Sequence, residues 1–396
     1  MSAILPVYAP APVTPVRGEG IWLIEADGTR WLDCIGGVAT NALGHCHPVL
    51  VSALRHQADK LWHISNALRI DGQQALAQRL VDSCFADRVF FCNTGTEAVE
   101  CAIKMARKYH AARGETERVD VIGLAGSFHG RTFAALNASG NDAYLSGFGP
   151  RMPGFVQLDL DDAEAIEAAI GAATAAAVII EPVQGEGGAR AISGEMLLRL
   201  RRLCTANGVL LIHDEVQSGM GRTGKLFAHQ WFDGAAPDIM AIAKALGAGF
   251  PVGACVASET AAAAMTVGTH GSTFGGNPLA MAVATAAFDV LADEAMLSNA
   301  REISGYLRDG LAAISRQYPQ IIQELRGKGL LVGLKLAVNN REFMAQAREE
   351  FLLLSGGGDN IVRILPPLIL TRAEGDEILR RVGATCEAIA TQRQAA

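Results

Sequence analysis

The feature that most constrains the fold of this chain is a regular alternation of short apolar segments with helical patterns between residues 88 and 242. The apolar segments are Arg88–Cys92, Val119–Leu124, Ala177–Ile180, Val209–His213 and Ile239–Ile242. The helical patterns between them include Thr96–Tyr109, Asp162–Ala173 and Glu195–Ala206. Strands that are short and apolar on both faces are typical of a mainly parallel sheet with helices on both sides. The sequence therefore predicts an α/β fold with such a sheet.

The two ends of the chain have a different character. A hairpin with an Asp27-Gly28 turn is expected at residues 21–33, followed by a helix near residues 48–62. After about residue 290 the predicted elements are a helix at Ala295–Ser315, a strand at Leu330–Leu336, a helix at Arg341–Leu353, a turn at Ser355–Gly358, a strand at Ile361–Leu365 and a terminal helix. We expect a large domain at 49–290 and a smaller α+β domain built from 291–396 together with the N-terminal segment 1–48.

Composition excludes several classes of protein. A formal net charge of −7 argues against nucleic acid or an acidic membrane as the partner. No apolar run reaches the roughly 18 residues of a membrane span, and the N-terminus lacks the features of a signal peptide. The eight cysteines form no CxxC pair, which favours reduced thiols in a cytoplasmic protein. His45-Cys46-His47 is better explained by a turn before Pro48 than by a metal site, and no metal is expected.

Two ionisable residues stand in apolar surroundings. Asp214 ends the buried segment Val209-Leu-Leu-Ile-His-Asp214, and Lys244 follows Ile239-Met-Ala-Ile-Ala. A charged side chain in such surroundings needs a partner or a shifted pKa. The reason is that removing one unpaired charge from water costs about several kcal/mol or more. A bound heterocycle would meet both needs if its protonated ring nitrogen faced the carboxylate and its aldehyde captured the amine. Taken singly, a surface acid and a snorkelling lysine would be the simpler explanations.

Other polar groups follow the predicted strands, at the edge where open α/β sheets bind ligands. Asn93-Thr-Gly-Thr-Glu97 opens a helix and is compatible with an anion site or with an ordinary capping box. Glu181 and Glu186 lie in a glycine-rich loop, where a charged ligand or a buried arginine would suit them. Phe128-His-Gly-Arg131 offers an aromatic face and a guanidinium suited to a carboxylate, although a surface loop is an equal alternative.

One segment imitates a nucleotide-binding motif. Gly219-Met-Gly-Arg-Thr-Gly-Lys225 fits both GxGxxG and GxxxxGK. Leu226 stands where a P-loop needs Ser or Thr, and five residues separate the segment from the preceding strand. A glycine-rich turn is the better interpretation.

Taken together, these motifs resemble the fold-type I pyridoxal-phosphate enzymes, specifically the class III aminotransferases, over essentially the whole chain. The most specific stretches are Asp214-Glu-Val-Gln-Ser-Gly-Met-Gly-Arg-Thr-Gly224 and Ala243-Lys-Ala-Leu-Gly247. Within the class, residues 37–48, 128–132 and 267–278 are similar to the acetylornithine and succinylornithine aminotransferases. The resemblance implies transfer of the terminal amine of N2-acetyl-L-ornithine to 2-oxoglutarate, as in arginine biosynthesis, by a cytoplasmic homodimer.

The resemblance also implies residue roles. Lys244 would bind pyridoxal 5′-phosphate covalently, and Asp214 would pair with its ring nitrogen. The other implied cofactor-binding residues are Thr94, Gly95, Thr96, Phe128, Val216, Gln217 and the partner subunit's Thr273. Arg131 and Arg363 would bind substrate carboxylates, with Glu186 neutralising Arg363 when no carboxylate is there.

The sequence departs from the family pattern at two positions. Thr94 replaces the usual Ser and keeps the hydroxyl, whereas His213 replaces the commoner Phe and should point away from Asp214 across the strand. Three rival functions remain open: ornithine or GABA aminotransferase, glutamate-semialdehyde aminomutase, and a non-catalytic nucleotide-binding protein. The sequence leaves the preferred acyl donor and assembly beyond a dimer undetermined.

Overall fold

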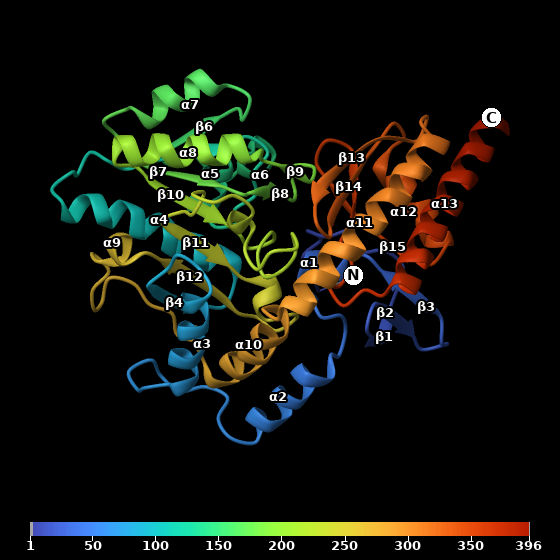
Figure 1. Cartoon of the computed structure of the whole chain (residues 1–396), viewed down its shortest axis with the longest axis horizontal. Coiled ribbons are helices and arrows are strands. Elements are labelled where there is room, and N and C mark those ends of the chain that lie inside the picture. Colours follow the sequence, from blue (N-terminus) through green and yellow to red (C-terminus); the bar gives the residue numbers. More distant parts are fainter. Residues whose placement is uncertain (1–2, 396) are drawn as a thin grey trace.

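The computed structural model describes residues 3–395, and within them the largest sheet has seven strands. Their order is β4 (Arg88–Cys92), β12 (Gly253–Ala257), β11 (Ile239–Ile242), β10 (Leu210–Asp214), β7 (Ala175–Ile180), β5 (Asp120–Leu124) and β6 (Phe155–Leu158). Neighbouring strands from β11 to β6 run parallel, and β12 runs antiparallel to both of its neighbours. The predicted mainly parallel sheet is confirmed (Figure 1).

Helices cover both faces of this sheet because its central strands are apolar on both sides. Ala177 and Ile179 of β7 share a core with α4 (Gly95–Ala112) and α5 (Phe133–Ser139). Val178 and Ile180, which point the other way, pack in a core with α7 (Ala163–Ile170) and α8 (Gly194–Asn207). Near β11 and β12 the same side is covered by the contacting helices α2 (Pro48–Ala58), α3 (Asp71–Asp82) and α10 (Pro278–Leu291).

The C-terminal region forms a second layered unit beside the first (Figure 1). Its sheet has the order β13 (Ile322–Lys328), β14 (Leu331–Leu336), β17 (Ile361–Ile364) and β16 (Ser355–Gly357). The helices packed around it are α11 (Glu294–Gln317), α12 (Asn340–Glu349) and α13 (Arg372–Ala395). A further sheet joins β1 (Pro15–Glu19), β2 (Trp22–Glu25) and β3 (Arg30–Asp33) to β15 (Leu352–Leu353). The N-terminal hairpin strands β2 and β3 therefore pair with each other, and β3 also pairs with β15 of the C-terminal region.

Two boundaries differ from the sequence-based expectation. The helix predicted to end at Leu353 stops at Glu349, and Leu352–Leu353 becomes a strand that pairs in parallel with β3. Ser355–Gly357, expected to form a turn, is the edge strand β16, and the turn itself follows at residues 358–360. Leu352–Leu353 is a strand because it pairs with β3, which is distant in the sequence, whereas Ser355–Gly357 pairs with the nearby strand β17 across a short turn.

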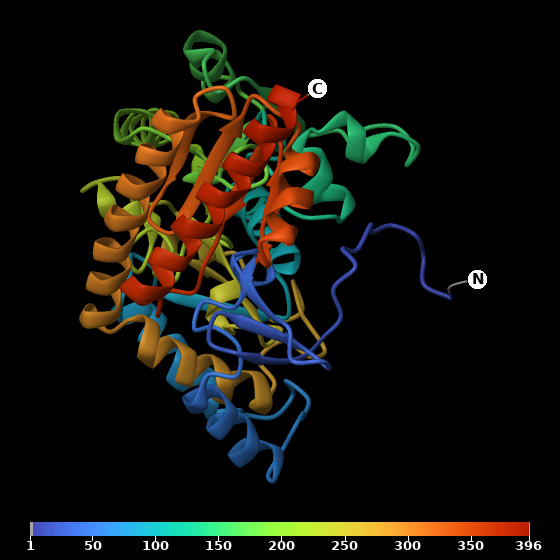
Figure 2. The same ribbon diagram turned by 90° about the vertical axis from the view of Figure 1, so that its right-hand side faces the viewer.

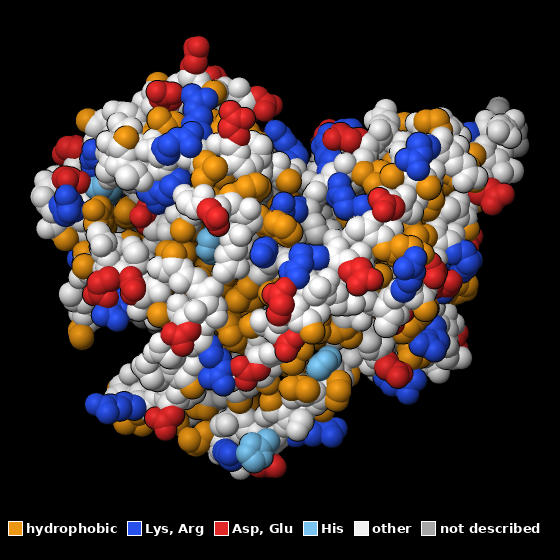
Figure 3. All heavy atoms as spheres, in the orientation of Figure 1, with side chains coloured by type: hydrophobic (Ala, Val, Ile, Leu, Met, Phe, Trp, Pro, Cys, Tyr) orange, Lys and Arg blue, Asp and Glu red, His pale blue; other side chains and the backbone are white. Residues whose placement is uncertain are grey.

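Figure 2 shows the N-terminal segment extending away from the body of the molecule. The apolar side chains of Leu5, Val7 and Tyr8 are exposed on it. Acidic and basic side chains are mixed over the face drawn in Figure 3, without a broad area of one charge. None of the helices in the described residues is long and apolar enough to cross a membrane.

Candidate active site

A cavity of about 340 Å³ lies at the edge of the large sheet where β4, β5, β7, β10 and β11 end. Volumes of about 300–1,000 Å³ are usual for small-molecule sites. Ten of the residues singled out in the sequence line the wall: Thr94, Gly95, Thr96, Phe128, Glu181, Glu186, Asp214, Val216, Gln217 and Lys244. Because the carboxyl ends of these strands meet at one edge of the sheet, side chains that are up to 150 residues apart in the chain (244 − 94) lie around one cavity.

Asp214 ends β10 and is 4% exposed. Its Oδ2 lies 2.8 Å from Nδ1 of His129, and its Oδ1 accepts a hydrogen bond of 3.1 Å from the backbone N–H of Val216. A carboxylate has about four acceptor positions, so these contacts leave room for one more donor from the cavity. The arrangement orients a buried anion toward the cavity.

His129 and Glu181 are buried ionisable neighbours of this carboxylate. Glu181 Oε1 accepts from the N–H of Phe128 at 2.7 Å, and its Oε2 accepts from Gly185 at 3.2 Å. Burial and then the nearby charge of Asp214 raise the pKa of Glu181 to about 7. Burial opposes a charge on His129, but its bond to Asp214 outweighs that effect and raises the pKa of His129. The role of His129 escaped sequence reasoning, because its partner lies 85 residues away.

Lys244 follows β11 and begins the short 3-10 helix η2 (Lys244–Leu246). Its backbone is left-handed, with φ of 42°, a conformation that non-glycine residues adopt rarely and mostly at functional sites. Burial and then the charge of Arg363 lower the pKa of the Lys244 ammonium to about 8. The neutral amine, which is the form that attacks a carbonyl, is therefore much more populated near physiological pH than it is for an ordinary lysine, although the ammonium still predominates.

The start of α4 forms another part of the wall. Thr94 caps the helix, since its Oγ1 accepts from the N–H of Glu97 at 3.2 Å. A side chain on Gly95 would place its Cβ 2.7 Å from Cγ1 of Val216, so this position requires glycine. The cap does not exclude an anion site, because the other first-turn N–H groups have no partner within their helix. The two alternatives drawn from the sequence are thus compatible.

Gln217 closes the cavity on the side of the N-terminal region. Its Nε2 donates to the carbonyl of Val38 at 3.3 Å, and its Oε1 is buried without a partner among the described residues. A buried polar atom without a partner costs about 1–3 kcal/mol. The free amide oxygen indicates that the cavity wall is completed by a polar group of a ligand.

Arg363 lies on β17 and is 2% exposed. Its Nη1 is 2.7 Å from Oε1 of Glu186, an ion pair without hydrogen-bond alignment. Its Nη2 donates to Ser355 Oγ at 3.0 Å and to the carbonyl of Gly356 at 2.7 Å. The side chain of Glu186 remains 34% exposed. It can therefore move away from Arg363 without a rearrangement of buried residues.

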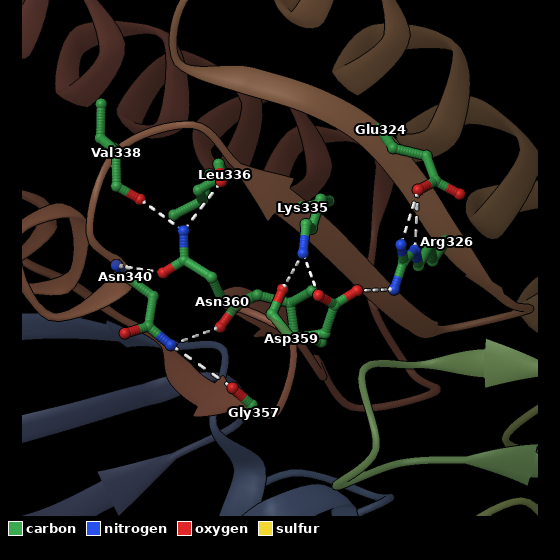
Figure 4. A network of polar contacts seen from close by, with 10 residues as sticks. Glu324, Arg326, Lys335, Leu336, Val338, Asn340, Gly357, Asp359 and Asn360 are labelled. Atoms are coloured by element: carbon green, nitrogen blue, oxygen red, sulfur yellow. Dashed lines mark hydrogen bonds and ion pairs between the residues drawn. The ribbon is translucent and has the colours of Figure 1, made fainter. Parts of the chain in front are cut away.

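The turn after β16 connects this pair to the C-terminal sheet. The N–H of Gly358 donates to the backbone carbonyl of Glu186 at 2.7 Å. Figure 4 shows the adjacent Asp359 held by Arg326, at 2.6 Å, and by Lys335. The backbone of the loop that carries Glu186 is therefore anchored to this turn, while the Glu186 side chain is partly exposed.

Three residues singled out in the sequence lie outside the cavity wall: Arg363, whose contacts are given above, Arg131 and Thr273. Arg131 is exposed, and its guanidinium carbon sits 4.0 Å from the ring centre of Tyr144 and 5.4 Å from that of Phe128. Thr273 is also exposed, in the segment between β12 and α10. Neither residue can contact a ligand in this cavity without a movement or a second subunit.

The glycine-rich segment at 219–225 is a largely buried turn, and none of its residues lines the cavity. Phosphates could not reach its backbone there. The sequence-based preference for a turn over a nucleotide-binding loop therefore agrees with the structure.

The cavity offers an oriented carboxylate, a partly neutral amine, a helix N-terminus and an unsatisfied amide. These groups fit a ligand that carries a protonated ring nitrogen, an aldehyde, a phosphate and a further polar substituent. The combination of Asp214 with Lys244 allows such a ligand to be held electrostatically at one edge and covalently at another. The wall thus fits pyridoxal 5′-phosphate.

Comparison with known proteins agrees with this geometry. A family model described as aminotransferase class-III matches residues 5–385. The chain is 57% identical over 385 residues to acetylornithine aminotransferase 2 of Caulobacter vibrioides, covering 97% of this chain and 95% of that protein. The ornithine aminotransferase of Toxoplasma gondii superposes with a TM-score of 0.94 at 34% identity, covering 98% and 94% of the two chains. A PLP-bound amine transaminase from an uncultivated Pseudomonas species gives a TM-score of 0.89 at 30% identity, covering 97% and 98%.

Proposed function

The chain belongs to the class III aminotransferases, which use pyridoxal 5′-phosphate, and from this premise we propose its substrates. It transfers the terminal amine of N2-acetyl-L-ornithine to 2-oxoglutarate, giving N-acetyl-L-glutamate 5-semialdehyde and L-glutamate. The observation that carries this proposal is 57% identity to an acetylornithine aminotransferase over nearly the full length of both proteins.

Ornithine is the second candidate donor, because an ornithine aminotransferase superposes with a TM-score of 0.94. Backbone similarity reports the fold, however, and one fold accommodates several substrates. The lower sequence identity of that protein, 34%, makes ornithine the weaker candidate.

We assign the chemistry at the cavity to Lys244 and Asp214. When bound, the cofactor delocalises the charge left on the substrate carbon that loses its proton. Asp214 keeps the ring nitrogen protonated, and His129 fixes the direction of that carboxylate through the 2.8 Å contact. The amine of Lys244, once free, takes the proton from the substrate carbon that bears the amino group. Its pKa of about 8 suits a base that works near neutral pH.

Arg131 and Arg363 are the proposed carboxylate-binding residues. N-acetylornithine presents one carboxylate, which Arg131 would bind, while the ion pair between Arg363 and Glu186 stays closed. Glutamate presents two carboxylates, and the second would displace Glu186 from Arg363. The exposure of Glu186 and the burial of Arg363 support this assignment, since the acid is the partner that can move.

A homodimer is the proposed assembly, with Thr273 contributing to the phosphate site of the other subunit. Thr273 is exposed and lies outside the wall of its own cavity. Phe274 and Val267, large apolar residues of the same segment, are exposed as well, which supports a protein partner on this surface. The cytoplasm is the proposed compartment, because all eight cysteines are free thiols.

A panel of amine donors tests the proposed substrate. The donors are N2-acetylornithine, N2-succinylornithine, ornithine, GABA and succinyl-diaminopimelate, each compared by kcat/KM with 2-oxoglutarate as acceptor. The proposal expects the highest value for N2-acetylornithine. A higher value for ornithine or GABA would transfer the assignment to the corresponding aminotransferase.

Complementation between two inactive chains tests the role of Thr273. A mixed dimer of a Lys244→Ala chain and a Thr273→Ala chain keeps one site that has both an intact lysine and the threonine of the other chain. The proposal expects this mixed dimer to regain activity. If Thr273 served the cavity of its own chain, mixing would restore nothing.

A further inference from the structure

Behind β10, on the side away from the cavity, three ionisable side chains come together. His213 and Glu215 are two positions apart at the end of this strand and therefore point to the same side, whereas Asp214 between them points to the cavity. The third side chain, His229, comes from the 3-10 helix η1 (Ala228–Trp231). None of the three lines the cavity, so they lie outside the candidate active site.

His213 is fully buried, and neither of its ring nitrogens has a hydrogen-bond partner among the described residues. Its ring centre is 6.3 Å from that of His229, too far for a direct bond between the rings to satisfy it. Leaving a buried polar group unsatisfied costs about 1–3 kcal/mol. The buried residues before it in the same strand, Leu211 and Ile212, are apolar. Burial of hydrophobic surface would favour another apolar side chain at this position, so it does not by itself explain a histidine.

Glu215 is 1% exposed and held in a fixed orientation. Its Oε2 accepts from the N–H of Ala228 at 2.5 Å, and its Oε1 accepts from the N–H of His229 at 3.0 Å. The Nδ1 of His229 lies 3.2 Å from the same Oε1. The carboxylate is thus aimed at both rings by backbone contacts that leave further lone pairs free.

We propose that His213, Glu215 and His229 bind a divalent transition-metal ion, with zinc as the best match. One ligand atom from each residue lies within 4.8 Å of the others, and this is the one such group found among residues 3–395. A tetrahedral zinc ion with ligands at about 2.0–2.2 Å needs spacings of about 3.4 Å between them. Binding would therefore need the two imidazole rings to turn toward the carboxylate, which its backbone contacts hold in place. Two imidazoles and one carboxylate form a known zinc ligand set, with water in the fourth position.

The ion would satisfy the buried ring of His213 and connect the end of β10 to η1. It would lie apart from the candidate active site, because none of its three ligand residues lines the cavity. Its nearest link to the active site is the backbone of Asp214, which stands between His213 of β10 and Glu215 just after the strand.

Zinc binding by the holoenzyme tests the proposal. The protein is treated with a chelator, reloaded with Zn²⁺, freed of unbound metal and analysed for zinc per chain by mass spectrometry. We expect one zinc ion per chain, and a crystal should show anomalous scattering at the zinc edge between the three side chains. Loss of one of three protein ligands should weaken zinc affinity by more than about 100-fold, beyond the effect of removing a supporting residue.

Three variants separate this site from adventitious binding. His213→Phe and His229→Gln should each lose the bound zinc, and His229→Gln serves if the phenylalanine variant does not fold. His56→Ala removes an exposed histidine far from the cluster in the fold and should keep one zinc ion per chain. The proposal is overturned if the wild-type protein retains no zinc, or if His213→Phe or His229→Gln retains as much as the wild type.

Discussion

Removal of the charge of Glu186 should change the balance between the two half-reactions. In the wild-type protein, a substrate with two carboxylates must break the 2.7 Å ion pair between Glu186 and Arg363. In Glu186→Ala that step disappears, and Arg363 is left buried without an acidic partner. Glutamate restores a partner to Arg363, whereas N-acetylornithine does not. The variant should therefore impair the acetylornithine half-reaction more than the glutamate half-reaction.

The burial of the two partners sets the size of this effect. Breaking a fully buried ion pair costs about 3–5 kcal/mol, and an exposed pair contributes about 0–1 kcal/mol. Arg363 is 2% exposed but Glu186 is 34% exposed, so an intermediate value of about 1.5–3 kcal/mol is appropriate. At 1.4 kcal/mol for each factor of ten, the ratio of the two half-reaction efficiencies should shift about 10-fold to 150-fold toward glutamate.

Single-turnover absorbance traces of each half-reaction measure this ratio directly. Glu186→Gln keeps the shape of the side chain and should reproduce the shift, because the charge is responsible. Glu195→Ala removes an exposed carboxylate elsewhere and should leave the ratio unchanged. Equal losses in both half-reactions of Glu186→Ala would refute the reasoning.

Three further changes test other parts of the structure. Gly95→Ala places a Cβ 2.7 Å from Val216 Cγ1, and this overpacking should lower the free energy of unfolding by about 1–3 kcal/mol in a denaturant titration; unchanged stability would contradict the close contact. The hydrogen bonds of Arg380 and then Arg381 hold the pKa of Glu377 at about 2, below its ordinary 4.5. Their stabilisation is complete above pH 4.5 and is lost as the pH falls toward 2, so Glu377→Gln should lower the Tm at pH 7 and the difference should shrink over that range; a difference independent of pH would be contrary to this. Because burial lowers the pKa of Lys244 to about 8, the rate of cofactor uptake by the apoprotein should rise with pH and level off above about 8, and a flat profile would argue against a neutral amine as the reacting form.

Five of the seven strands of the large sheet could be predicted because each is a short apolar run, whereas the edge strand β6, which is only partly buried, and β12 were not predicted. β12, with the sequence Gly-Ala-Cys-Val-Ala, gave no comparable signal, since small residues carry little pattern. The helix α12 was extended too far in the prediction because Leu352 and Leu353 continue an apolar run. Their pairing with β3, more than 300 residues earlier, decides their conformation and leaves no local trace.

The candidate site was predictable in part for a similar reason. Strand ends indicated Asp214 and the start of α4, because the carboxyl ends of neighbouring strands meet at one edge. The contact between His129 and Asp214 depends on how two loops fold together, and no spacing in the sequence encodes it. The residue roles themselves came from family resemblance and stay predictions, among them those of Arg131 and Thr273, which lie outside the wall of the cavity.

The surroundings of His213 are another example of contacts that the sequence does not encode. Its alternation with Asp214 along the strand was predicted and is confirmed, since only Asp214 reaches the cavity. The neighbour that gives His213 a chemical context is His229, which lies on a separate 3-10 helix. Only the folded chain brings the two rings together.

The most direct test of the account concerns the attachment of the cofactor. The holoenzyme is reduced with borohydride, digested and analysed by peptide mass spectrometry. We predict a phosphopyridoxyl group on Lys244 and on no other lysine. An active enzyme that carries the label on another lysine, or carries none, would contradict the central claim that Lys244 and Asp214 hold the cofactor between them.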